Sequence, residues 1–313
     1  MFRRLTILVV LLMAVMNGTF AQYDPSFSHY WAMEPAYNPA AAGKGNKLNF
    51  TAAYNMSLVG FTHNPKTIYA GADMPLNLLG ANHGVGLQLL NDQIGLFRHQ
   101  KLALQYAYKH KLLGGVISAG IQAGILSENF DGSKLDAIDP NDPALSSSEV
   151  TGTGFDLCAG LYFVHRAGWY LGLSAQHLNS PTVELGETSE LSINGTYYFT
   201  GGYNIKLRNP FFTIHTSVLG RTNGLSYRGD LTARVRYSHE KRVMYAGLSY
   251  SPANSVSLLV GGNFQGISLG YCYEAYTSAI SLGNGSHELI LGYQTDINLF
   301  KKGRNKHQSV RIL

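Results

Sequence analysis

Residues 255–260 read Ser-Val-Ser-Leu-Leu-Val, residues 267–274 read Ile-Ser-Leu-Gly-Tyr-Cys-Tyr-Glu, and residues 286–293 read Ser-His-Glu-Leu-Ile-Leu-Gly-Tyr. In each segment large apolar side chains alternate with small or polar ones, and turn residues such as Gly262 and Asn263 lie between the segments. A period of two places successive side chains on opposite faces of a β-strand. These segments therefore predict three strands with one aliphatic face, which ends in tyrosines, and one small or polar face.

The same alternation recurs along nearly the whole chain, which predicts one large barrel. With the three closing segments there are 14 such strands, an even number, and about 18 residues per strand and connection suits strands of about 9–11 residues. The predicted fold class is all-β, a transmembrane antiparallel β-barrel of about 14 strands over residues 47–297. The other alternating segments are 47–58, 68–74, 85–89, 101–109, 117–125, 155–163, 169–175, 197–207, 212–218, 230–237 and 244–250.

Composition favours a barrel in outer-membrane lipid over a soluble protein. Only 14% of the 313 residues are charged, whereas soluble domains average about 25%. The mean hydropathy of −0.04 argues against many apolar helices but suits strands with one lipid face and one lumen face. A soluble β-sandwich is the alternative, but it needs only about seven to nine strands. The net charge of +5 includes Arg3 and Arg4 of the leader, so we expect no nucleic-acid partner.

Residues 1–21 have the features of a secretory signal peptide. Arg3 and Arg4 are followed by an apolar run from Leu5 to Met16 and by Thr-Phe-Ala at residues 19–21, a pattern typical of a cleavage site. We expect cleavage after Ala21 and localisation in the cell outer membrane. An uncleaved anchor is the alternative, but the apolar run is shorter than a membrane span requires.

Residues 22–46 form an N-terminal aromatic and proline-rich segment without strand alternation. It contains three prolines, which interrupt regular hydrogen-bonded ladders, and six aromatic side chains when His29 is counted. So many large side chains are expected to be packed. The segment is predicted either to plug the barrel or to lie along its periplasmic rim.

Two long connections and a tail complete the chain. Residues 127–152 hold six acids and one base, which predicts a solvated loop or, alternatively, a divalent-cation or partner site. Residues 179–193 form the second long connection, and both are expected on the extracellular side. The basic tail, residues 298–313, is either a periplasmic contact or a free end. Cys158 and Cys272 are expected to be free, buried thiols on nearly opposite walls.

The sequence shows no motif typical of an enzyme or of a metal or nucleotide site. No G-x-S-x-G motif occurs, and Ser286, His287 and Glu288 are neighbours that alternate across a strand, which does not form a triad. The histidines lack the paired spacing of a zinc site, and glycine pairs such as Gly84 and Gly86 lack the strand–helix setting of a nucleotide loop. We predict no catalytic residue, no metal and no cofactor.

Six short motifs lie in the N-terminal segment and the closing strands. They are Asp-Pro-Ser-Phe-Ser-His-Tyr at residues 24–30, Tyr-Asn-Pro-Ala-Ala-Ala-Gly at 37–43, Tyr-Ala-Gly-Leu-Ser-Tyr at 245–250, Val-Ser-Leu-Leu-Val-Gly at 256–261, Gly-Tyr-Cys-Tyr-Glu at 270–274 and Gly-Ser-His-Glu-Leu at 285–289. In these motifs the chain resembles the PorP/SprF family of outer-membrane proteins of the type IX secretion system. Two departures from the family pattern are Cys272 and Glu274, where relatives often have Ser and Asp.

The resemblance implies a non-enzymatic component of protein secretion and, in relatives, of gliding motility. The implied partners are a periplasmic peptidoglycan-binding lipoprotein and ring components of the secretion system, or the C-terminal signal domain of secreted cargo. The alternative function is a porin or a hydrophobic-solute transporter of the fatty-acid-channel type. The residues expected to form the plug or to dock a partner are Asp24, Pro25, Phe27, Tyr30, Trp31, Tyr37, Asn38, Pro39 and Gly43.

Overall fold

A computed structural model describes residues 23–78, 80–134, 148–186, 189–240, 242–277 and 285–296. The predicted signal peptide, the basic tail and residues 135–147 of the acidic connection lie outside these ranges. No helix among the described residues is long and apolar enough to cross a bilayer.

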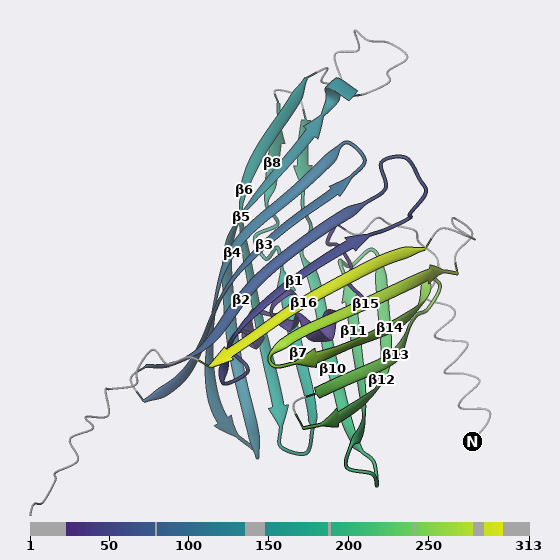
Figure 1. The fold of residues 1–313 in the computed structure, drawn as a ribbon. Coiled ribbons are helices and arrows are strands. Elements are labelled where there is room, and N and C mark those ends of the chain that lie inside the picture. Colours follow the sequence, from purple (N-terminus) through teal and green to yellow (C-terminus); the bar gives the residue numbers. More distant parts are fainter. Residues whose placement is uncertain are drawn as a thin grey trace, which may run out of the picture.

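Fourteen strands close into one antiparallel barrel (Figure 1), which confirms the predicted fold class. Each strand pairs with its neighbour in sequence, except that β7 pairs with β10, and β1 closes the ring against β16 with Lys47 opposite Asp296 and Met56 opposite His287. The barrel strands are β1 Lys47–Met56, β2 Lys66–Leu78, β3 Ala81–Ile94, β4 Phe97–Leu112, β5 Gly115–Asp131, β6 Glu149–His165, β7 Trp169–Gln176, β10 Thr196–Lys206, β11 Phe212–Thr222, β12 Tyr227–His239, β13 Arg242–Ser251, β14 Ser255–Phe264, β15 Ile267–Tyr276 and β16 Ser286–Asp296.

The alternation in sequence sorts side chains between lipid and lumen as predicted. On β4, Leu102 and Leu104 are 47% and 66% exposed, whereas Lys101, Ala103 and Gln105 between and beside them are at most 4% exposed. The exposed aliphatic face suits the hydrocarbon region of a membrane, and the buried face encloses the lumen. The same division holds on β14, where Val256, Leu258 and Val260 are exposed and the intervening side chains are buried.

The two ends of the barrel differ. Short turns at residues 78–81, 112–115, 165–169, 239–242 and 264–267 lie at the end where β1 begins and β16 finishes, which we call the turn end. The long connections at 131–149 and 176–196 lie at the opposite, loop end. Outer-membrane barrels place short turns in the periplasm and long loops outside, so we expect the turn end to face the periplasm.

The barrel wall is also uneven in height. Strands β5 and β6 have 17 residues each, whereas β13, β14 and β15 have 10, and the longer strands rise as a tall wall in Figure 1. The sequence prediction placed the ends of β5 and β6 in the acidic connection, but residues 127–131 and 149–152 are strand. Alternation continues there with polar side chains, which hid the strand ends.

The second long connection contains a hairpin that the sequence prediction missed. Strands β8 (Thr182–Leu185) and β9 (Ser189–Ser192) form a separate two-stranded sheet. Val183 and Ile193 are fully buried against the lumen-facing Leu126, so the connection folds inward over the loop end. Residues 179–193 therefore form a long connection as predicted, but the hairpin within it was not predicted: burial of two apolar side chains stabilises strands of only four residues each.

Both cysteines are free and buried, as expected. Cys158 lies on β6 and Cys272 on β15, which are seven steps apart in the ring of fourteen strands. They therefore stand on opposite walls, too far apart for a disulfide.

Candidate functional site

The N-terminal segment lies inside the barrel, which decides between the two predicted placements. Residues 23–45, here called the plug, run from the loop end to the turn end through three short helical turns, η1 Tyr30–Ala32, α2 Glu34–Tyr37 and η2 Pro39–Ala41 (Figure 1). Pro35 and Pro39 stand in the first turns of α2 and η2, where a missing N–H costs nothing. Among the predicted plug residues, Phe27, Tyr30 and Tyr37 are buried in one cluster with luminal side chains of the wall.

A chain of buried charges holds the plug at the loop end. Lys101 Nζ lies 2.6 Å from Asp156, and Asp156 lies 2.8 Å from Nδ1 of His177. His177 Nε2 in turn lies 3.1 Å from Asp24 of the plug, whose second oxygen accepts a 2.8 Å hydrogen bond from Tyr198. Charges this deeply buried are tolerated only when they are paired.

A second luminal triad lies beside this chain. The Tyr23 hydroxyl donates to Glu128, and His99 contacts both. Tyr23 also stands edge-on to His177, with ring centroids 5.3 Å apart. The first described residue of the plug is therefore fixed at the loop end of the lumen.

Two wall residues bind the plug backbone below these charges. Arg221 donates to the carbonyl oxygens of Asp24 and Pro25 and to the Ser26 hydroxyl. Glu288 accepts from the N–H groups of Ser28 and His29 at 2.6 and 2.9 Å and pairs with His29 Nδ1 at 2.6 Å. Since a segment without ladder partners leaves its N–H and C=O groups unpaired, these contacts satisfy groups that burial would otherwise penalise.

The middle of the plug is bound through side chains of the predicted motif. The Tyr30 hydroxyl donates to Ser217 and Thr232, on the neighbouring strands β11 and β12. Asn38 donates to the carbonyl oxygens of Leu161 and Leu173, while its side-chain oxygen accepts from Ala40 N–H and caps η2. Both residues therefore serve plug-to-wall packing.

The backbone of the plug closely approaches two luminal glycines of the wall, which gives a testable prediction. A Cβ at Gly84 would lie 1.9 Å from the Ala42 carbonyl oxygen, and one at Gly120 would lie 2.3 Å from the Ala40 nitrogen. Gly84→Ala and Gly120→Ala should each destabilise the plugged barrel by roughly 1–3 kcal/mol or more, because the obstructing atoms are backbone. The free energy of unfolding in urea, measured in lipid vesicles, checks this. Gly229→Ala is the matched control, since a Cβ there meets nothing within 4 Å; equal losses in all three variants would contradict the prediction.

Asp24 and His177 make the plug sensitive to pH. Burial alone would lower the pKa of His177, but the charge of Asp24 and hydrogen bonds to Asp156 and Asp24 raise it from 6.5 to about 9. Burial alone would raise the pKa of the Asp24 carboxyl, but the charges of His177 and Lys101 hold it below its ordinary 3.8. The raised pKa of His177 stabilises the fold fully below pH 6.5 and progressively less as the pH rises to about 9. The lowered pKa of Asp24 stabilises the fold above pH 3.8 and progressively less as the pH falls below that value.

We therefore expect the plug to resist protease best between about pH 4 and 6.5 and to weaken as pH approaches 9. Proteolysis of residues 23–45 across this range measures the effect. His177→Gln should be less stable throughout but should lose the decline above pH 6.5. A wild-type profile that stays flat from pH 6.5 to above 9 would contradict this assignment.

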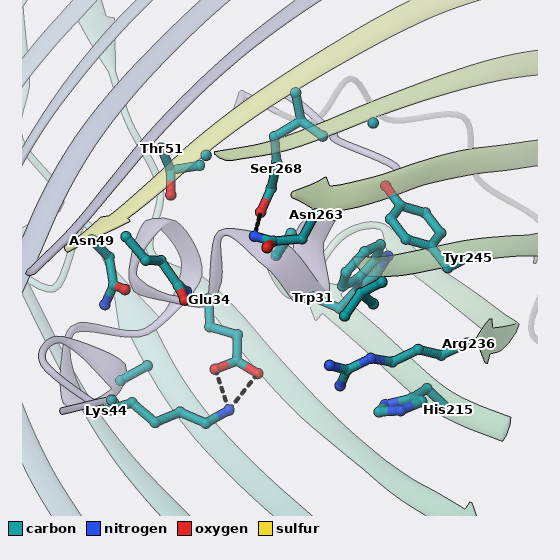
Figure 2. A pocket seen from close by; sticks show the side chains of 18 of the residues that line it. Trp31, Glu34, Lys44, Asn49, Thr51, His215, Arg236, Tyr245, Asn263 and Ser268 are labelled. Atoms are coloured by element: carbon teal, nitrogen blue, oxygen red, sulfur yellow. Dashed lines mark hydrogen bonds and ion pairs between the residues drawn. The ribbon is translucent and has the colours of Figure 1, made fainter. Parts of the chain in front are cut away.

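Below the plug, a cavity of about 730 Å³ opens toward the turn end. Its roof is formed by the plug residues Trp31, Glu34 and Lys44, and its walls by the turn-end halves of the strands (Figure 2). Of the nine residues predicted from sequence as plug or docking residues, Trp31 alone is among the lining residues described for this cavity. The polar and aromatic side chains that line the cavity from the wall include Asn49, Asp73, His215, Arg234, Arg236, Tyr245, Asn263 and Ser268.

Most charges around this cavity already have partners. Lys44 binds both carboxylate oxygens of Glu34 at 2.6 and 2.9 Å, as the dashed lines in Figure 2 show. Asp73 accepts from Gly43 N–H at 2.7 Å and from Asn49 at 3.2 Å. Among the described residues there is no cluster of three or more groups suited to hold a metal ion.

The family model for the type IX secretion system membrane protein PorP/SprF matches residues 19–293. This match spans the plug and almost the whole barrel. The chain belongs to the PorP/SprF family. It is thereby identified as an outer-membrane component of the type IX secretion system.

Solved structures share the fold of this PorP/SprF protein. The toluene transporter TbuX of Ralstonia pickettii is 13% identical with a TM-score of 0.52, and the match covers 90% of this chain and 97% of that one. The CymD monoaromatic hydrocarbon channel is 10% identical with the same TM-score and coverage. The TodX deltaS2S3 mutant monoaromatic hydrocarbon channel is 11% identical, with a TM-score of 0.52 and coverage of 83% and 93%. No curated protein matches.

The residues that hold the plug were largely missed from sequence. Arg221 and Glu288 contact the plug, and Lys101 and Asp156 belong to the charge chain that reaches it through His177, yet the sequence pattern assigned none of these four a role. The available signal was their position: each is a charged residue on the luminal register of a strand, and such residues require partners. Sequence alone did not reveal that the partners lie in the N-terminal segment.

Proposed function

We propose that this PorP/SprF protein is a closed outer-membrane anchor whose periplasmic face binds a protein partner of the secretion system. Family membership supports a place in the secretion system, and the observation that carries the anchor role is the plug. Residues 23–45 lie inside the barrel and are bound to the wall at several heights through Asp24, His29, Tyr30, Asn38 and Gly43. The candidate partners are a periplasmic peptidoglycan-binding lipoprotein and ring components of the secretion system, or the C-terminal signal domain of secreted cargo.

Buried contacts of this kind favour an anchor over a channel. When such a contact between plug and wall breaks, it leaves a buried charge or a buried backbone group without a partner, which is energetically costly. The hydrocarbon channels named above share the fold at 10–13% identity, and that likeness extends to architecture alone. The transporter alternative therefore has no observation of its own in this chain.

Site-specific cross-linking in the native envelope tests the anchor. A photo-crosslinking phenylalanine analogue replaces Phe211, which is 42% exposed at the turn end. The matched control replaces Leu225, which is 55% exposed in the turn between β11 and β12 at the loop end. We expect adducts with periplasmic proteins from position 211 and none from position 225, with partners identified by mass spectrometry.

Conductance and uptake decide the alternative. The purified barrel in planar bilayers is expected to carry no steady ion current, and vesicles containing it are expected to take up toluene no faster than empty ones. A steady ungated current, or toluene uptake without periplasmic adducts from position 211, would favour the transporter and overturn the anchor.

A further inference from the structure

We propose that the periplasm-facing cavity binds a carboxylate carried by a polypeptide segment of the partner, and that Arg234 and Arg236 form the anion-binding pair. This inference rests on the proposed function and names the chemistry by which the partner is recognised. The two arginines lie on the luminal register of β12, one above the other, and both line the cavity.

Arg234 is a buried cation that has no carboxylate within ion-pair distance among the residues the structure describes. The residue is only 9% exposed, and no ion pair or hydrogen bond joins its guanidinium to any residue in the described ranges. Its guanidinium carbon lies 3.3 Å from the centre of the Trp31 ring of the plug. A buried guanidinium normally has a carboxylate or phosphate partner, so the cavity offers an unfilled anion site.

The neighbouring strands shape this site. His215 on β11 stands directly opposite Arg234, and Tyr245 on β13 stands opposite Arg236. Tyr245 also packs edge-on to Trp31, with ring centroids 5.2 Å apart. In Figure 2, Arg236 and His215 extend from the wall toward the space below Trp31. Two guanidinium groups beside two aromatic rings suit a planar carboxylate attached to a bulky chain.

The other charges of the cavity do not supply this partner. Glu34 is engaged by Lys44, and Asp73 is engaged by Gly43 and Asn49. Neither carboxylate lies within ion-pair distance of the arginines. The positive charge of the arginine pair is therefore available to a ligand entering from the turn end.

A polypeptide fits this cavity better than a lipid or free phosphate. The hydrogen-bonded wall from β13 to β16 closes the cavity toward the bilayer, so acyl chains have no lateral path. Amide and hydroxyl groups of Asn49, Asn263 and Ser268 also line the cavity, and such groups hydrogen-bond peptide backbones. The volume of about 730 Å³ is within the usual range for a binding site, about 300–1,000 Å³.

Tryptophan fluorescence of the full-length barrel in detergent tests the site directly. The chain has two tryptophans, and both line the cavity, so Trp169→Phe leaves Trp31 as the reporter. The probes are acetyl-Gly-Ser-Ala-Leu with a free C-terminal carboxylate, its C-terminal amide, and the amide of acetyl-Gly-Glu-Ala-Leu. We expect saturable quenching or a spectral shift with at least one carboxylate peptide, and affinity at least about tenfold weaker for the first amide. The third peptide distinguishes an acidic side chain from a chain terminus as the source.

Three variants separate the arginine pair from general effects of charge. Arg236→Gln, at an exposed position, should weaken binding of the carboxylate peptide by about tenfold. Arg234→Lys keeps the charge but removes the planar fork, and should weaken it by a similar factor. Arg242→Gln is the matched control, because Arg242 lies at the turn end over the Phe264 ring and outside the cavity lining; its affinity should be unchanged.

Several outcomes would overturn the proposal. The first is equal binding of the carboxylate and amide peptides, and the second is no binding of any peptide. The third is displacement of the bound peptide by inorganic phosphate or dihexanoyl-phosphatidylglycerol at a concentration below that of the peptide. Cross-links from position 211 that persist without peptide binding would overturn the cavity site while leaving the anchor function standing. Loss of those cross-links alone would overturn the anchor function.

Discussion

Lys101→Met should destabilise the plugged barrel by roughly 3–5 kcal/mol. Lys101 and Asp156 are 4% and 0% exposed at their side chains, and His177 carries its proton at neutral pH because its pKa is raised to about 9. The positive charges of Lys101 and His177 thus balance the negative charges of Asp24 and Asp156. Removal of Lys101 leaves one uncompensated negative charge in the lumen, which is far more costly than loss of a surface ion pair. Urea unfolding in lipid vesicles measures the change.

A double-mutant cycle separates this charge effect from lost packing. Lys101→Met combined with Asp156→Asn restores neutrality, with His177 and Asp24 still paired. The double variant should therefore cost about 1–3 kcal/mol less than the sum of the two single variants. Simple additivity would show that Lys101 acts through volume alone.

Glu288→Ala is expected to release the upper part of the plug, with a loss of roughly 3–5 kcal/mol in the free energy of unfolding. Three donors converge on this carboxylate: Ser28 N–H, His29 N–H and His29 Nδ1. In the variant all three are left buried without an acceptor. Protease should then cleave residues 23–30 in the otherwise folded barrel, which mass spectrometry of the fragments would show.

The neighbouring residue supplies the control for Glu288. His287 points to the opposite face, where its ring bonds the Tyr271 hydroxyl at 2.7 Å. His287→Ala should change stability by about 0.5 kcal/mol or less and leave residues 23–30 protected. Protection of these residues in Glu288→Ala as well would show that the carboxylate does not hold the plug.

The strands and their faces could be predicted from sequence because they follow from a local period. Each of the fourteen alternating segments corresponds to one barrel strand, and alternation alone places Asp230, Thr232, Arg234 and Arg236 on one face of β12, opposite its apolar side chains. Strand ends were less predictable, as at Asp131 and Glu149, because polar side chains replace the lipid-facing ones above the membrane. The β8–β9 hairpin was missed because its stability comes from Val183 and Ile193 packing on Leu126.

The placement of the plug depended on contacts between distant parts of the sequence. Aromatic and proline content indicates that residues 22–46 are packed, but a rim and a lumen would bury them equally well. The deciding pairs, Asp24 with His177 and His29 with Glu288, are separated by 153 and 259 residues. The residues of the opening motif mostly bind the wall, and no local pattern marks Arg234 and Arg236 as a pair for which the described residues supply no carboxylate partner.

The direction of the plug bears on how the barrel is built. Residue 23 sits at the far end of the lumen from residue 45, inside a ring whose seam is the β1–β16 pair. We expect residues 23–45 to bind the inner face of the curved sheet before β1 pairs with β16. Pairing of these two strands then encloses the segment. During refolding, protection of residues 23–45 from protease should then appear in the same kinetic phase as seam closure. A protein assembled in this order would carry its plug from the moment the barrel closes.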